Sequence, residues 1–405
     1  MVPTGSPRAR TSSLEGGVLS TSLVFINNSR ETYTSSHSGA IATCIRAVTA
    51  EAAAGGVEPK IITRRHATGA NPDPWPSLYE VPAIRPLRTR AGMTVSRARR
   101  RVNGWARPDQ WTYSSDVERI LRTIRPRTVI VNNDPEIAVR LRRRFPAMHV
   151  IHWFHNLELT SDRFRRHFAA DTGITSMAVS AYLARAVEHA YGMSPGRVRV
   201  NLNGVDSAEF APAERPERVP TVGFLGRIAV EKGLDVLLDA AMMLAGSDVA
   251  FTVQIIGDTN WGERNSNPYI RAVEQQIVAL GDHGVRVTNL GHLGRAAVPA
   301  ALASSDIHVF PSRWDEPFGL ALLEGMASGQ AVIASATGGA PEVLAGTGAL
   351  FAREDARALA GILRPLLRDR QSRIKLGDEA RRRAKELTWH ATWQRMQALI
   401  EDGPS

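Results

Sequence analysis

The sequence predicts an α/β protein of two Rossmann-like domains, each with a parallel sheet, whose sheets face a central cleft. Three observations support this fold class. The chain has 405 residues, whereas a single hydrophobic core stops growing near about 250 to 300 residues. Short apolar runs alternate with segments of helical period, as in a parallel sheet covered on both faces. A stretch rich in Pro and Glu, residues 207–220, interrupts this alternation, which then starts again.

The first domain is expected to span residues 21–207, after a leader of residues 1–20 whose Ser, Thr, Gly and Pro content predicts disorder. Its strands are predicted from short apolar runs, and its helices from apolar residues at helical spacing. In chain order we expect a strand at 22–27, a helix within 38–56, a strand at 57–63, a helix at 117–124, and strands at 128–133 and 149–156.

Residues 71–113 carry many Pro and Arg and no clean period, so we expect a long excursion from the first domain. Its arginine-rich part, residues 85–107, has two interpretations. One is a solvated surface, and the other is a site for an anionic acceptor or a membrane surface. The arginines that would favour an acceptor with phosphate or carboxylate are Arg97, Arg99, Arg100 and Arg101.

A linker is expected at 208–218 and the second domain at 219–386. Ligands of open parallel sheets bind outside the carboxyl ends of the strands, so the chemistry should lie in the loops that follow them. The expected elements are strands at 221–226, 251–257, 285–291, 307–312 and 331–335, with a helix at 234–245.

Composition limits the partners and the compartment. The formal charge of +10 favours phosphate-bearing partners, although nucleic acid is not the one expected. The single cysteine, Cys44, excludes an internal disulfide and a cysteine zinc cluster, and is expected to be buried. No run approaches the roughly 20 apolar residues that cross a bilayer, and no signal peptide is evident. We therefore expect a cytoplasmic protein, and peripheral contact with a membrane stays open.

The segment HVFPSRWDEPFGLALLEGMASG is the most informative part of the sequence. A strand ends at Pro and Ser, a loop carries Glu316, and Pro317 is expected to open a helix. Gly319 lets a ligand approach the helix start, where free backbone N–H groups bind a diphosphate. If one helix carried both Glu316 and Glu324, they would lie roughly on one side, about 12 Å apart along the axis. Two such carboxylates can bind hydroxyls of a sugar and a ribose.

Two cations lie upstream in GFLGRIAVEKGLDVLL. Arg227 follows a predicted strand and Lys232 precedes a predicted helix, so both can point into the cleft. They would stabilise the charge of a leaving diphosphate. The alternative is a loop salt bridge, such as one between Lys232 and Glu231. No acidic cluster resembles a magnesium site, so no metal is expected.

These strings resemble the large retaining family of GT-B glycosyltransferases called family 4. The resemblance runs from about residue 176 to 345. It is carried by SMAVSAYLARAV, VNLNGVDSAEF, GFLGRIAVEKG, IIGDTNWG, NLGHLGRAAVPAALASSDIHVFPS, EPFGLALLEGMASG and ATGGAPEVL. The stretch IIGDTNWGERNSNPYI is also similar to members that build spore-coat or envelope polysaccharides.

The resemblance implies a metal-independent enzyme in which two Rossmann-like domains enclose a nucleoside diphosphate sugar, the donor, and no cofactor takes part. A UDP-sugar is favoured over a GDP-sugar. Glu324 would bind the ribose, Glu316 the donor sugar, and Arg227 and Lys232 the diphosphate. Further donor contacts are expected at Asn203, near the hinge, and at Gly226, Gly291, His292, Phe318, Gly319 and Leu320.

The first domain matches the family less well. The paired glycines that follow the family's first strand appear here as Ser38-Gly39, so only Gly39 carries over. His155 matches the family's His beside the donor sugar, and a structural role is the alternative; His152 is expected to pack in the core. WHATWQRMQALI, in residues 387–405, looks like the family's last helix, which crosses back to the first domain with Trp389 and Trp393 as apolar anchors.

The favoured reaction transfers a hexose-type sugar with retention to a small-molecule, glycan or lipid-linked acceptor, with the leaving diphosphate as base. Two alternatives stay open. One is a GT-B nucleotide-sugar epimerase, because a shared fold does not fix the reaction. The other is a non-catalytic module that binds anions or membranes and keeps a vestigial donor site.

Overall fold

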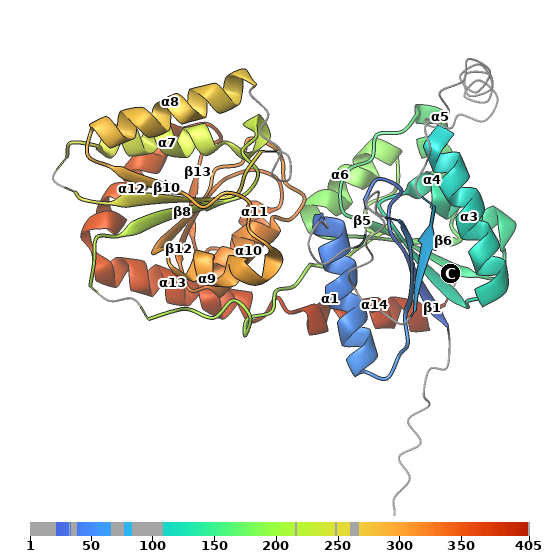
Figure 1. The fold of residues 1–405 in the computed structure, drawn as a ribbon. Helices are drawn as coiled ribbons and strands as arrows, with labels where there is room; N and C mark the ends of the chain where they lie inside the picture. The colour runs from blue at the N-terminus through green and yellow to red at the C-terminus, as the bar shows by residue number, and fades with distance from the viewer. Residues whose placement is uncertain are drawn as a thin grey trace, which may run out of the picture.

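The protein has two α/β domains, each built on a parallel sheet with helices on both faces (Figure 1). The computed structural model describes residues 22–31, 33, 39–65, 77–82, 108–214, 217–247, 249–259 and 267–403. The first sheet has seven strands in the order β3-β2-β1-β4-β5-β6-β7, and the second has six in the order β10-β9-β8-β11-β12-β13. The predicted fold class is therefore confirmed.

The first sheet forms from short apolar runs that are buried on both faces, because helices cover each side. Its strands are β1 Leu23–Ile26, β2 Lys60–Arg64, β3 Leu78–Val81, β4 Thr128–Asn132, β5 His149–Phe154, β6 Ile174–Ala178 and β7 Val198–Val200. Its helices are α1 Ala40–Ala54, α3 Pro108–Ile124, α4 Pro135–Arg144, α5 Asp162–Ala170 and α6 Ala181–Tyr191. Three helix starts are fixed by side-chain caps, in which Asp134 accepts from Ile137 N, Ser161 from Phe164 N and Ser180 from Leu183 N.

The second sheet repeats this arrangement. Its strands are β8 Thr221–Leu225, β9 Thr252–Ile256, β10 Arg286–Asn289, β11 Ile307–Phe310, β12 Ala331–Ser335 and β13 Ala349–Phe351. Its helices are α7 Leu234–Leu244, α8 Pro268–Asp282, α9 Val298–Ala303, α10 Leu320–Ala327, α11 Ala340–Leu344, α12 Ala356–Arg368 and α13 Arg370–Ala384, with 3-10 turns η1 Val230–Lys232 and η2 Arg295–Ala297.

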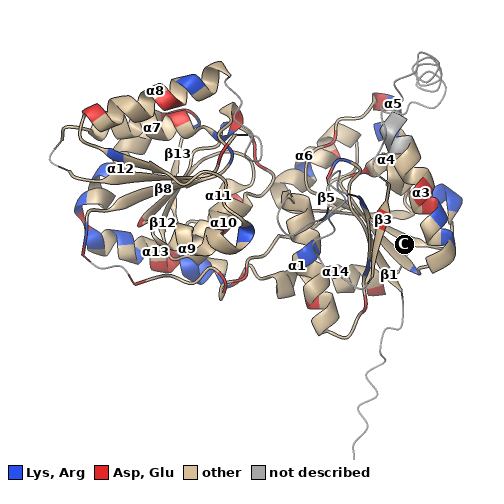
Figure 2. Ribbon diagram, viewed as in Figure 1, with Lys and Arg blue, Asp and Glu red and all other residues tan. Residues whose placement is uncertain are grey.

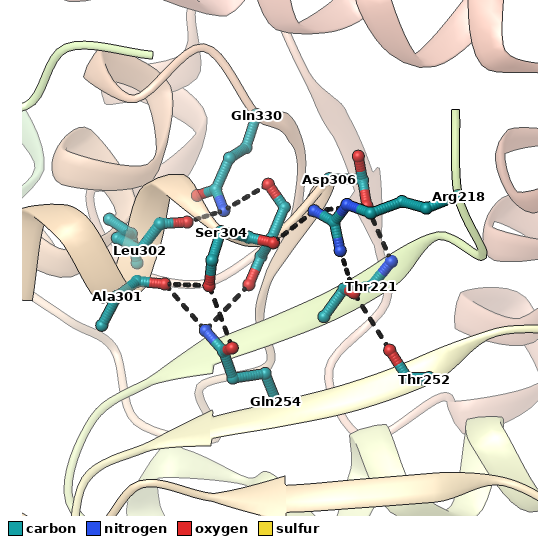
Figure 3. Close-up of polar contacts among 10 residues, drawn as sticks. Arg218, Thr221, Thr252, Gln254, Ala301, Leu302, Ser304, Asp306 and Gln330 are labelled. Atoms are coloured by element: carbon teal, nitrogen blue, oxygen red, sulfur yellow. Dashed lines mark hydrogen bonds and ion pairs between the residues drawn. The ribbon is translucent and has the colours of Figure 1, made fainter. Parts of the chain in front are cut away.

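A polar network joins the amino ends of the strands in the second sheet (Figure 3). The Asp306 carboxylate accepts a 2.8 Å hydrogen bond from Thr221 N and lies 3.4 Å from the Arg218 guanidinium. Gln330 donates to the carbonyl of Leu302 at 2.6 Å. These contacts hold β8, β11 and β12 together at their amino ends. The ligand site is expected at the opposite, carboxyl ends of the strands.

The predicted excursion over residues 71–113 is partly wrong. Leu78–Val81 form strand β3, which pairs in parallel with β2 at the edge of the first sheet. Helix α3 begins at Pro108, so the end of the segment belongs to a helix that also contains the predicted 117–124. Residues 83–107, which include the whole arginine-rich part 85–107, lie outside the described residues, as does the leader 1–20.

The chain crosses between the domains twice, and the two crossings touch. Val205 N donates a 2.9 Å hydrogen bond to Leu387 O. A Cβ placed on Gly204 would lie 2.2 Å from the backbone of Thr388, so only glycine fits there. After the second crossing, α14 Trp389–Glu401 packs against α1 of the first domain (Figure 1), with Trp393 buried.

Charged side chains lie mainly on the outer helices of both domains, while the strands are mostly uncharged (Figure 2). Helix α13 shows this clearly, because it carries Arg381, Arg382 and Arg383 in its last turn, where cations suit the helix dipole. Across the described ranges, no helix combines the length and the apolar character that spanning a membrane would require.

Candidate active site

Charged side chains gather where the strands of the second sheet end. Lys232, at the end of η1 after β8, forms an ion pair with Glu316, in the loop after β11. The Lys232 ammonium also lies 5.8 Å from the ring centroid of Trp314, which is 42% exposed. Arg227 pairs with Glu231 at 2.8 Å. Lys232 therefore does not pair with Glu231, and the two cations have different carboxylate partners.

The loop that carries Glu316 differs from the predicted helix start. Helix α10 begins at Leu320, and Gly319 precedes it with φ +91°, a left-handed conformation that favours glycine. Glu316 and Pro317 therefore lie in the loop, and the expectation of one helix carrying both Glu316 and Glu324 is wrong. A bulkier residue at 319 would be strained whatever space surrounds it.

A glycine pair from the next loop fixes the Glu316 backbone. Gly339 N donates a 2.7 Å hydrogen bond to Glu316 O. Gly338 has φ +54°, and a Cβ placed on it would lie 2.2 Å from that same carbonyl oxygen. The string TGGAPE thus supplies the close backbone approach that holds Glu316 in position.

Glu324 lies on α10 and is only 4% exposed. Its Oε1 accepts a 2.6 Å hydrogen bond from Arg295, at the start of η2. Burial raises the pKa of the Glu324 carboxyl, and the neighbouring Arg295 guanidinium opposes that shift. Arg295 is a functional candidate that sequence reasoning missed, because a single arginine after Gly294 carries no motif.

A cavity of about 150 Å³ lies at the ends of β8 and β9. A Cβ on Gly257 would lie 1.9 Å from Gly226 O, so two backbone segments pass each other closely at this cavity. Gly257 N in turn donates to Gly291 O at 2.9 Å. The lining includes Gly226, Arg227 and His292, so the structure brings these three predicted site residues together.

His155 follows β5 in the first domain and is buried. Its Nε2 lies 3.0 Å from Asn132 Oδ1, while the Asn132 amide nitrogen donates to the backbone oxygen of Ile26 at 3.0 Å. With Asn132 in this orientation, Nε2 of His155 carries the proton. Burial lowers the pKa of His155 to about 3, so the ring is neutral. His152 is fully buried 4.1 Å from the Phe154 ring, in agreement with its predicted packing role.

Gly39 directly precedes α1, but a carboxylate lies against it. A Cβ placed on Gly39 would be 2.7 Å from the Glu31 carboxylate, and Glu31 also accepts from Ala42 N at 3.3 Å. Burial raises the pKa of the Glu31 carboxyl. Asn203, the residue predicted near the hinge, is 4% exposed, and its Oδ1 has no hydrogen-bond partner among the described residues.

The first domain touches the loop of Glu316 directly. Ser180 Oγ donates to Pro317 O, and the Glu342 carboxylate accepts from Ala181 N at 2.9 Å and from Tyr182 N at 3.1 Å. A side chain of the second domain thus caps the start of α6 in the first. Glu342 is a second contact residue to which sequence reasoning gave no role, although it follows the glycine pair in TGGAPE.

Two family models match the chain, one for each domain. The model for glycosyl transferases group 1 matches residues 206–383, and the model for glycosyltransferase family 4 matches residues 41–209. Together they extend over both sheets. The chain belongs to the family 4 glycosyltransferases.

Curated relatives of the chain share a quarter to a third of the aligned residues with it. A sulfoquinovosyl transferase of Arabidopsis thaliana is 31% identical over 56% of this chain and 43% of its own. A D-inositol 3-phosphate glycosyltransferase of Corynebacterium glutamicum is 30% identical over 53% of this chain and 54% of its own. The alignments thus cover about half the length of these relatives. Spore coat protein SA of Bacillus subtilis is 25% identical over 84% of its length and 74% of this chain.

Solved structures show the same GT-B fold. A glycosyltransferase from Rickettsia africae superposes with a TM-score of 0.75 at 17% identity, covering 95% of this chain and 98% of that one. HepE of Anabaena in complex with UDP superposes with a TM-score of 0.70 at 18% identity, covering 94% of this chain and all of that one.

Most predicted site residues of this family 4 member lie beyond the carboxyl ends of the strands in the second sheet, on the side that faces the first domain. Those on or beside the loop and start of α10 are Glu316, Phe318, Gly319, Leu320 and Glu324, with Phe318 buried at 3% exposure. Among the described residues, no group of three His, Cys, Asp or Glu side chains is placed to hold a metal ion. The site therefore contains cations and hydrogen-bonding carboxylates at the carboxyl ends of the strands.

Proposed function

We propose that the protein transfers a hexose-type sugar from a nucleoside diphosphate sugar to an acceptor, with retention of configuration and without a metal ion. The observation that carries the proposal is the ion pair between Lys232 and Glu316 beside the start of α10, with Arg227 on the neighbouring loop. Two cations and the free N–H groups near Gly319 suit a diphosphate, and the adjacent carboxylate suits sugar hydroxyls.

A UDP-sugar is the donor that we favour. Structures of HepE from Anabaena contain UDP, UDP with glucose, and UDP-glucose, and that protein has the same fold. The cavity at Gly226 and His292 would receive the base, and Glu324 would accept hydrogen bonds from the ribose hydroxyls. Glu316 would do the same for the donor sugar once Lys232 turns to the diphosphate.

In the proposed reaction, the bond between the anomeric carbon and the diphosphate oxygen breaks first. Arg227 and Lys232 stabilise the negative charge that develops on the leaving group. A diphosphate oxygen then takes the acceptor proton as the acceptor attacks the same sugar face, so no enzyme nucleophile is required. His155 stays neutral and presents its unprotonated Nδ1 as a hydrogen-bond acceptor for a donor-sugar hydroxyl.

The acceptor is expected to bind mainly to the first domain. A cavity of about 120 Å³ lies at the ends of β1 and β4 and is lined by amides, by Asp134 and Glu158, and by Arg30. Arg30 already forms a 3.1 Å ion pair with Glu158, so this cavity suits hydroxyl groups better than an anion. A phosphate-bearing acceptor would instead need the arginine-rich residues 85–107, which lie outside the described residues.

A panel of UDP- and GDP-hexoses tests the proposal. We expect the purified protein to release UDP slowly from its own donor by hydrolysis, and EDTA to leave the rate unchanged. With an acceptor extract, proton NMR of the product should show the donor's anomeric configuration. Conversion of one UDP-hexose into another would instead identify an epimerase, and diphosphate binding without any turnover would identify a non-catalytic module.

A further inference from the structure

Glu324 is a buried carboxylate with one polar partner. Its Oε1 accepts from Arg295 at 2.6 Å, and Oε2 makes no hydrogen bond to any residue in the part of the chain that the structure describes. Ionised carboxylates accept several hydrogen bonds, and a buried one that lacks them is costly. Glu324 therefore has one oxygen fixed by Arg295 and one oxygen that no described residue binds.

Arg295 is held in place independently of Glu324. Its guanidinium lies 5.0 Å from the ring centroid of Phe210, a fully buried residue of the segment that joins the domains. Glu209, next to Phe210, also attracts the Arg295 charge. A guanidinium stacked on an aromatic ring loses little conformational freedom when it binds a carboxylate. The direction of the Glu324 side chain is thus set from outside α10.

We propose that Arg295 is a positioning residue of the nucleoside site: it binds Oε1 of Glu324 so that Oε2 faces the ribose as an ionised acceptor. The inference rests on the proposed function, because it takes Glu324 as the ribose ligand. It adds a residue from η2 to the ribose contact, for which the family resemblance names Glu324 of α10.

The charge of Glu324 depends on few neighbours. The titratable and charged groups that face it are Arg295 from η2, Glu209 from the linking segment and Cys44 from α1. Burial and Glu209 raise the pKa of Glu324, whereas Arg295 lowers it. Without Arg295, the carboxyl would take up a proton at a higher pH, and a protonated Glu324 accepts hydrogen bonds less strongly.

The second sheet provides a matched control at the amino ends of its strands. Arg218 pairs with Asp306 at 3.4 Å, and the exposures of the two side chains, 36% and 9%, are close to the 40% and 6% of Arg295 and Glu324 (Figure 3). Asp306 also accepts from Thr221 N, so that pair joins strands far from the ligand site. Replacing either arginine removes one cation from one buried carboxylate of the same domain.

The experiment measures the affinity for UDP, GDP and ADP by calorimetry from pH 5.5 to 8.5. The proteins are the wild type, Arg295→Gln, Arg295→Lys, Arg218→Gln and Glu324→Gln, and thermal unfolding confirms that each is folded. Because the diphosphates titrate themselves, the informative quantity is the ratio of the Kd of each variant to that of the wild type at the same pH.

We expect Arg295→Gln to weaken binding about tenfold at pH 8.5. The ratio should then grow by up to about tenfold per pH unit below the new pKa of Glu324. Arg295→Lys should restore a nearly constant ratio because it keeps the charge, and Arg218→Gln should give a ratio near one throughout. A constant ratio for Arg295→Gln would overturn the positioning role even if binding were weaker, because a purely structural loss does not depend on pH.

Two other outcomes would contradict the premises of the inference and not the positioning role itself. If the wild type binds none of the three diphosphates, the proposed function is wrong and the inference falls with it. If the wild type binds and Glu324→Gln binds equally well, the ribose role of Glu324 is wrong, while the proposal of a diphosphate-sugar donor survives.

Discussion

Lys232 and Glu316, which are 84 residues apart in sequence, form an ion pair across two loops of the second domain. The pair keeps the ammonium beside the start of α10. In the proposed reaction, a donor diphosphate must draw Lys232 away from Glu316 and thereby free the carboxylate for the sugar. One exchange of partners would then prepare both ends of the donor.

Lys232→Ala and Arg227→Ala are each expected to lower kcat by about 10²-fold or more, because each removes charge stabilisation that matters most in the transition state. Folding should survive, since Arg227 is exposed and its one ion-pair partner among the described residues is Glu231. Steady-state kinetics with the true donor measures the effect. Lys375→Ala, an exposed lysine on α13, serves as the control and should keep the wild-type rate.

Near wild-type kcat in either the Lys232 or the Arg227 variant would show that its cation does not act on the diphosphate. Loss of thermal stability in the same variant would instead point to a structural role. The two readouts separate because neither Arg227 nor Lys232 belongs to a hydrophobic core.

Glu324→Ala should weaken binding of the free nucleoside diphosphate by about tenfold or more, because the ribose loses an ionised acceptor. Glu316→Ala should leave that affinity within about threefold and instead damage sugar transfer. Calorimetry with UDP and kinetics with the UDP-sugar measure the two effects. Equal losses of UDP affinity in both variants would contradict the division of roles.

Gly338→Ala should lower kcat at least tenfold, because the new Cβ would collide with Glu316 O and move the loop. Gly346→Ala is the matched control, since Gly346 also has a positive φ, +85°, but faces open space. Both variants should lose about 1 kcal/mol of stability from the left-handed backbone, Gly338→Ala should lose more through the collision, and only Gly338→Ala should lose activity. Similar kcat values would refute the steric support of Glu316.

The free energy of unfolding should fall as the pH drops from 7.5 to 5. Burial lowers the pKa of His152 to about 3 in the folded protein, whereas the unfolded chain titrates near about 6.5. The unfolded state therefore binds the extra proton below pH 6.5, and each such histidine costs about 2 kcal/mol by pH 5. His152→Phe should reduce the slope of the unfolding free energy against pH by the equivalent of about one bound proton. Urea unfolding at several pH values measures this slope.

Both sheets were predictable because buried parallel strands read as continuous apolar runs, as in Leu23–Ile26 and Ala331–Ser335. The strands that were missed lack this pattern. Val198–Val200 has two exposed residues, and β3 lies at a sheet edge where none of its first three residues is fully buried. An edge strand needs a neighbour to define it, and a local sequence window does not contain that neighbour.

The candidate site was predictable where its residues belong to a recognisable sequence motif. Gly319 and the glutamates of the α10 segment belong to such a motif. The partners of those residues were not predictable, because ion pairs such as Arg295 with Glu324 depend on which loops meet in space. The predicted helix at Pro317 failed for a related reason: the left-handed φ of Gly319 delays the helix start, and only the three-dimensional path of the loop reveals this.

The return of the chain through Leu387 to α14 has a consequence for biosynthesis. The face of α1 that meets α14 ends at Gly55, where an added Cβ would lie 3.9 Å from the indole nitrogen of Trp393. A ribosome makes α1 early and α14 only after the whole second domain. That face of α1 therefore stays exposed to solvent while the second domain is synthesised and folds. The first domain, although its synthesis begins first, is completed last.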